Sequence, residues 1–118
     1  MADPYVHLLT HQAGTYTYVR SRHTANTGEW QHWVAVKVGT TAKLYLNGVE
    51  DLPYTSLSDP MNNPVSAPSD SLKIGSGSWG YANGLIDEVR IYNQALSAFE
   101  IQKHYAEGLG KHDNLAVK

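Results

Sequence analysis

The residue with the clearest chemical potential is an aspartate inside an apolar strand pattern. Asp87 alternates with Leu85, Val89 and Ile91, so the four side chains are expected on one inward face of a strand. A carboxylate there needs a partner, because burying an unpaired charge is costly. Either loop amides or a buried cation satisfy it, or it helps to bind Ca²⁺, which prefers carboxylate and carbonyl oxygens. The oxygen-bearing side chains that would join such a metal site are Asp59, Asn62, Asn63 and Asp70.

Aromatic rings offer a second kind of chemistry. Trp79 and Tyr81 lie in a glycine-rich loop, and exposed rings bind sugars by stacking against their C–H faces. Asn83 in the same loop and Tyr54 earlier in the chain are further candidates for ligand binding. The structural alternative is that Trp79 covers an edge of the fold, because tryptophan is highly buried on average.

The patterns of the common enzyme classes are missing. Asp87 and Glu88 are adjacent, so in a strand they point to opposite sides and cannot form the facing carboxylate pair of a glycosidase. Residues 75–80 match the spacing G-x-G-x-x-G, but no helix pattern begins there, as a dinucleotide site requires. The histidines are scattered, and neither G-x-S-x-G nor a P-loop occurs. The sequence therefore predicts a protein that is not an enzyme.

Composition narrows the class further. The chain has 118 residues, which is the size of one domain, and its net charge of −2 gives no basic footprint for a nucleic-acid partner. It contains no cysteine, which excludes disulfides, Cys-zinc sites and thiol catalysis. No run is apolar enough to insert into a membrane, and the first residues lack the pattern of a signal peptide.

The elements that must position these residues read as strands joined by tight turns. Asn47-Gly48 and Asn83-Gly84 are typical of two-residue hairpins, and residues 52–70 form a proline-rich excursion. The strand-like segments are 5–11, 15–22, 30–38, 42–52, 71–76 and 85–93. Many short strands with turn signals at short spacing predict an all-β antiparallel sandwich.

One helix is expected near the C-terminus. Ser97 and Glu100 form a capping box, and Leu96 and Ile101 occupy the positions of a hydrophobic staple. Gly108 is expected to end this helix, because glycine is the usual residue just beyond a helix C-terminus.

Together these segments resemble the LamG-like jelly-roll domain of the concanavalin A-like lectin/glucanase superfamily. The stretches that carry the resemblance are 30–36, 43–49, 72–75 and 83–101. The resemblance implies a single domain over residues 1–118: an all-β, antiparallel jelly-roll β-sandwich with one short C-terminal α-helix. It also implies a non-catalytic carbohydrate-binding or adhesion module of an extracellular or cell-surface bacterial protein. Its partner would be a glycan or a cell-surface polysaccharide, and Asp87 would help to hold a structural Ca²⁺.

The sequence departs from the family in one important respect. Family domains open with strands that carry an acidic, glycine-rich stretch, and this opening is not found here, so the resemblance predicts a truncated or incomplete sandwich. In the family, the first strand pairs near the strand that corresponds to residues 85–93. We expect either residues 5–22 or another copy of the chain to supply that partner. The alternative function is therefore a structural self-assembly module, in which a neighbouring chain completes the sandwich in an oligomer or filament.

Overall fold

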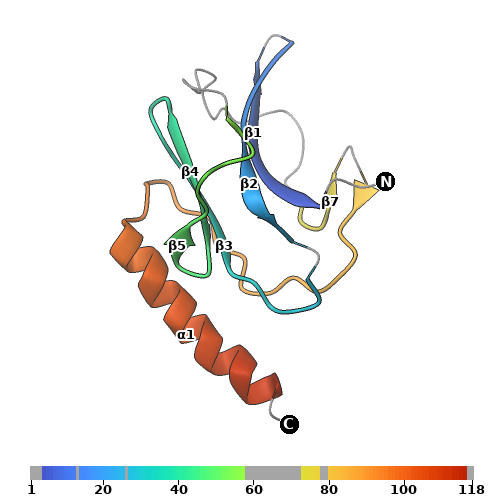
Figure 1. Cartoon of the computed structure of the whole chain (residues 1–118), viewed down its shortest axis with the longest axis vertical. Coiled ribbons are helices and arrows are strands. Elements are labelled where there is room, and N and C mark those ends of the chain that lie inside the picture. The colour runs from blue at the N-terminus through green and yellow to red at the C-terminus, as the bar shows by residue number, and fades with distance from the viewer. Residues whose placement is uncertain (1–3, 13, 26, 58–72, 78–79, 117–118) are drawn as a thin grey trace.

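The computed structural model describes residues 4–12, 14–25, 27–57, 73–77 and 80–116 (Figure 1). Its described part is mostly β, with two antiparallel sheets of three strands and one C-terminal helix, consistent with a β-sandwich. Within that part, no helix is both long and apolar enough to cross a membrane.

The first sheet is built from the two N-terminal strands that the sequence predicts. Strand β1 (Tyr5–Gln12) pairs with β2 (Thr15–Thr24), and β2 pairs on its other side with the short β6 (Ser56–Leu57). The β1–β2 register places Leu8 opposite Val19 and Thr10 opposite Thr17. The hydroxyls of Thr10 and Thr17 lie 2.7 Å apart, so this buried polar pair is satisfied across the strands.

The second sheet contains β3 (Trp33–Val38), β4 (Thr41–Leu46) and β5 (Val49–Glu50), in that order. Asn47 and Gly48 join β4 to β5 with φ angles of 51° and 83°, which confirms the predicted tight hairpin. Glycine at position 48 also permits a close approach of the helix, because a Cβ there would lie 3.3 Å from Tyr105 Cδ2.

The core lies where the two sheets face each other (Figure 1). Val19 of β2 and Leu44 of β4 are fully buried, and Ala42 lies beside them. Val6, Leu8 and Tyr54 pack against this cluster from its margin. Strand alternation explains the choice of residues, because Ala42 and Leu44 point to one side of β4 and Lys43 and Tyr45 to the other.

Helix α1 (Ala98–Ala116) begins with the predicted capping box. Ser97 Oγ accepts a hydrogen bond from the Glu100 N–H at 3.1 Å, and Glu100 Oε1 accepts one from the Ser97 N–H at 3.3 Å. The predicted stop at Gly108 is wrong, because the helix continues through this glycine to Ala116. The residue lies in the helix interior close to Glu88, where a Cβ would meet Glu88 Oε2 at 3.4 Å. A glycine costs a helix only about 1 kcal/mol relative to alanine, which is too little to end it alone.

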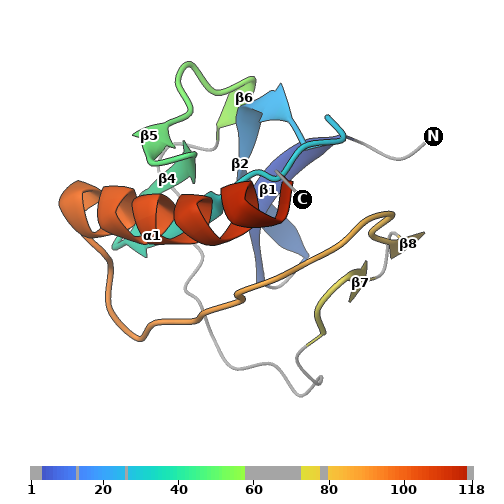
Figure 2. The same ribbon diagram turned by 90° about the horizontal axis from the view of Figure 1, so that it is seen from below.

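The predicted strand over residues 85–93 is not formed. In the described chain these residues belong to no sheet, and Asn83-Gly84 joins no hairpin. Upstream, β7 (Ser76–Gly77) pairs with β8 (Gly80–Tyr81). The strand predicted over 71–76 is therefore wrong at residues 73–75, which are described and belong to no strand, and it forms only at Ser76. Figure 2 shows the chain after β8 running as an extended segment alongside α1 before it turns back into that helix.

Candidate functional site

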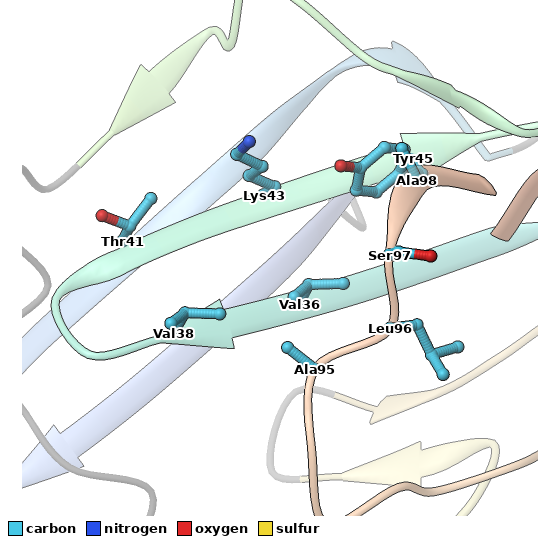
Figure 3. Close-up of a pocket in the computed structure, with 9 residues that line it drawn as sticks. All are labelled: Val36, Val38, Thr41, Lys43, Tyr45, Ala95, Leu96, Ser97 and Ala98. Carbon is cyan, nitrogen blue, oxygen red and sulfur yellow. The ribbon is translucent and has the colours of Figure 1, made fainter. Parts of the chain in front are cut away.

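An open groove of about 440 Å³ lies between the second sheet and the segment that leads into α1 (Figure 3). Strands β3 and β4 form its floor, and the chain just before α1 forms the opposite wall. The lining residues are Val36, Val38, Thr41, Lys43, Tyr45, Ala95, Leu96, Ser97 and Ala98.

Strand pairing explains why these side chains meet. The β3–β4 register sets Val36 opposite Lys43 and Val38 opposite Thr41, so all four share the face turned away from the core. Val38, the last residue of β3, is 60% exposed there. The groove is therefore the face of the second sheet that the core does not use.

The chemistry of the groove is amphipathic. Val36, Val38 and Leu96 supply apolar surface, while Lys43 and Thr41 contribute an ammonium and a hydroxyl. None of the nine lining residues carries a carboxylate, so the groove itself has no acid–base pair for hydrolysis. Such a surface suits a ligand that has both apolar faces and hydroxyl groups.

The predicted sugar-binding residues do not come together at this groove. Tyr81 is 90% exposed on β8, and Asn83 is exposed two residues further on. Both belong to the β7–β8 region, which contributes nothing to the lining of the groove. Trp79 lies outside the described residues. Tyr81 and Asn83 therefore form a second, exposed candidate surface.

Tyr54 is held by contacts within the protein. Its hydroxyl accepts a hydrogen bond from the Leu44 N–H at 3.0 Å and donates one to Glu50 Oε2 at 2.7 Å. Burial and the neighbouring Glu50 carboxylate raise the pKa of this phenol well above its usual range. The ring packs against the core, so Tyr54 links the sheet edge to the interior.

We expect Tyr54→Phe to lower the free energy of unfolding by about 1–3 kcal/mol, because it leaves the Leu44 N–H and Glu50 without their partner. Chemical denaturation of the purified variant measures this loss. If Tyr54→Phe folds with unchanged stability but loses affinity for a glycan, the hydroxyl serves a ligand and the structural assignment fails. Tyr81→Phe is the matched control, because that tyrosine is almost fully exposed.

The predicted metal residues are likewise not assembled by the described chain. Asp87 is exposed, so the expectation that it faces inward is wrong, and its Oδ1 accepts a hydrogen bond from the Glu88 N–H at 2.8 Å. Asp59, Asn62, Asn63 and Asp70 lie outside the described residues. Among the residues that are described, no three His, Asp or Glu side chains are grouped to hold a metal ion. One aspartate falls short of the six to eight oxygens that Ca²⁺ takes, so calcium binding stays a prediction.

Sequence reasoning missed a buried carboxylate. Asp51 is only 5% exposed, and its Oδ2 accepts hydrogen bonds from the backbone N–H groups of Arg22 at 2.7 Å and His23 at 2.9 Å. Its Oδ1 lies 2.5 Å from Nδ1 of the His23 ring. Burial alone would raise the pKa of this carboxyl, but the hydrogen bonds from His23 and Arg22 outweigh it and hold the pKa below its usual value. Asp51 therefore ties the end of β2 to the chain after β5.

A second missed cluster holds α1 in place. The backbone N–H of His32 donates to Asn47 Oδ1 at 2.9 Å, and the Asn47 N–H donates to the His32 carbonyl at 2.8 Å. The ring of His32 lies 6.0 Å from that of Tyr105, and burial lowers the pKa of His32, as do the charges of His104 and Arg90. On the same helix, Nδ1 of His104 lies 3.3 Å from both Arg90 Nη1 and Tyr92 Oη. These contacts align the extended segment with α1.

Comparisons with known proteins bear mainly on the fold. The family model described as the concanavalin A-like lectin/glucanases superfamily matches residues 3–102. A similar solved structure is the 2.1 Å crystal structure of residues 221–444 of an S-layer domain-containing protein from Clostridium thermocellum ATCC 27405. The two chains are 24% identical with a TM-score of 0.57, and the match covers 87% of the present chain and 52% of the solved one. The chain thus spans about half the length of that structure. No curated protein matches the sequence.

Proposed function

Because the chain belongs to the concanavalin A-like lectin/glucanase superfamily, whose model matches residues 3–102, we propose that it is a non-catalytic carbohydrate-binding or adhesion module with a jelly-roll sandwich. Its ligand would be a glycan or a cell-surface polysaccharide. The fold alone hosts many functions, so the proposal must rest on a site.

The observation that carries the proposal is the amphipathic groove on the outer face of the second sheet. A sugar ring has apolar C–H faces and a rim of hydroxyls, and the groove offers apolar surface from Val36 and Val38 beside the donors Lys43 and Thr41. Its open shape fits the side of a polysaccharide chain better than a small enclosed ligand. The lack of a carboxylate among its lining residues agrees with binding without cleavage.

The cell surface is the proposed location. The related crystal structure belongs to a protein described as S-layer domain-containing, and S-layers lie outside the cell. A structural Ca²⁺ at Asp87 is kept as part of this proposal, with Asp59, Asn62 and Asp70 as the side chains that would have to join it. Calorimetry with Ca²⁺ that shows neither heat nor a change in melting temperature would remove the metal from the proposal.

The test is a glycan array followed by titration of the bound oligosaccharide against variants. We expect Lys43→Met and Ala95→Trp to weaken binding at least tenfold, because the first removes a donor and the second fills the groove. Lys103→Met, on the exposed side of α1, is the matched control and should bind as the unmodified chain does. Binding lost in Tyr81→Ala or Trp79→Ala but kept in the groove variants would move the site to the β7–β8 region. Binding to no glycan contradicts the proposal.

The second candidate is a self-assembly module, and one observation favours it. The apolar residues of the extended segment, Leu85, Ile86, Val89 and Ile91, are all at least half exposed. Large contiguous patches of exposed apolar residues mark interaction surfaces in soluble proteins. A neighbouring chain that covered this segment would make assembly part of the function.

A further inference from the structure

The extended segment over residues 85–92 has the sequence of a strand without the structure of one. Leu85 is 83% exposed and Ile91 is 72% exposed, and none of the described residues from 82 to 97 belongs to a sheet. Building on the self-assembly candidate, we propose that two copies of the chain pair through this segment as antiparallel strands, with the two Val89 residues opposite each other on a twofold axis.

The pattern of charges selects this register. In a symmetric antiparallel pair, a residue that precedes the axis residue in one copy lies opposite the residue that follows it by the same number of positions in the other copy. With Val89 on the axis, Glu88 of each copy faces Arg90 of the other, which gives two ion pairs of opposite charge. The neighbouring registers set like charges against each other, because Asp87, Glu88 or Arg90 would then meet its own copy on the axis.

The apolar residues support the same register. It places Ile86 of each copy opposite Tyr92 of the other, and an aromatic ring beside a β-branched side chain is a favourable cross-strand pair. Val89 meets Val89, while Asp87 faces Ile91 and Leu85 faces Asn93, which are the two poor matches. Pairing would also bring the exposed apolar residues of the two segments into contact and remove part of their surface from water.

The backbone of the unpaired segment is strained at one point. Glu88 has a φ of 53°, in the left-handed region that side chains with a Cβ rarely adopt. Pairing requires this residue to become extended, so the strain would be released on assembly. Arg90 and Tyr92 lie beside His104 of α1, and these contacts hold the segment parallel to the helix. Pairing therefore requires Arg90 to exchange its contact with His104 for Glu88 of the other copy.

Because the chain contains no cysteine, one introduced thiol reports the register directly. We expect Val89→Cys to form a disulfide-linked dimer under mild oxidation, since residues opposite each other on the axis lie within disulfide distance. Ile91→Cys is the matched control: it is also exposed, but four residues separate the two copies along the strands, or about 14 Å, so it should not cross-link. Equal cross-linking at both positions would overturn the register.

Charge exchange tests the ion pairs independently of thiols. Glu88→Arg and Arg90→Glu should each weaken the dimer at least tenfold in light scattering or sedimentation, and the double variant should restore it. A dimer that persists without the Val89 cross-link, and ignores these exchanges, would keep the self-assembly function and refute this interface. A chain that stays monomeric at millimolar concentration would refute both.

Discussion

Asp51→Ala is expected to destabilise the chain by about 2–4 kcal/mol, because hydrogen bonds to a charged group contribute more than neutral ones and their removal leaves buried donors unsatisfied. The Asp51 carboxylate accepts hydrogen bonds from the backbone N–H groups of Arg22 and His23 and contacts the His23 ring. It is almost completely buried. Urea denaturation measures the loss. Asp87→Ala is the matched control on an exposed aspartate and should change stability by less than about 0.5 kcal/mol.

The pH dependence of the unfolding free energy tests whether the negative charge of Asp51 is the source of its stabilising effect. The pKa of Asp51 is lowered in the folded chain, so its contribution is complete above the unfolded value of about 4 and is lost as the pH falls through the lower, folded value. Asp51→Asn keeps the shape without the charge. Its unfolding free energy should therefore fall less steeply with acid than that of the unmodified chain. Identical acid dependence in both would mean that Asp51 is not the group that titrates.

Local sequence signals predicted the parts of the fold that depend on neighbouring residues. The Asn47-Gly48 hairpin follows from the positive φ that both positions require, and the capping box follows from the spacing of Ser97 and Glu100. The strand-like segments 5–11 and 15–22 also correspond to β1 and β2. The N-terminus of α1 was therefore predictable, but its end was not, because a single glycine is a weak helix breaker.

Long-range partners are what the sequence could not supply. The Asp51 clamp joins residues 28 and 29 positions apart, and nothing in the local pattern of either segment marks the other. The strand predicted over residues 85–93 was wrong for the converse reason. Their alternation is a good strand signal, but a strand also needs a neighbouring strand, and the alternation does not show which segment that is. The groove was missed for a related reason, because the strand pattern of residues 30–38 does not show which segment lies against their outer face.

Leu44→Ala and Leu85→Ala give the largest contrast that the structure predicts. Both leucines lie in strand-like segments of the sequence, and the alternation over residues 85–91 predicts that Leu85 faces inward. Leu44 is fully buried between the sheets, so its truncation should cost about 2–5 kcal/mol through lost burial and the cavity left behind.

Leu85 is 83% exposed, so its truncation should cost less than about 0.5 kcal/mol in a monomer at low concentration. Comparable losses of unfolding free energy at the two positions would mean that residues 85–93 form a core strand and would contradict their exposed position. A loss at Leu85 that grows with protein concentration would instead indicate that its partner is a second chain, because only an intermolecular contact makes stability depend on concentration. The same pair of variants therefore distinguishes three states of this segment: exposed to solvent, buried within its own chain, or buried against another copy.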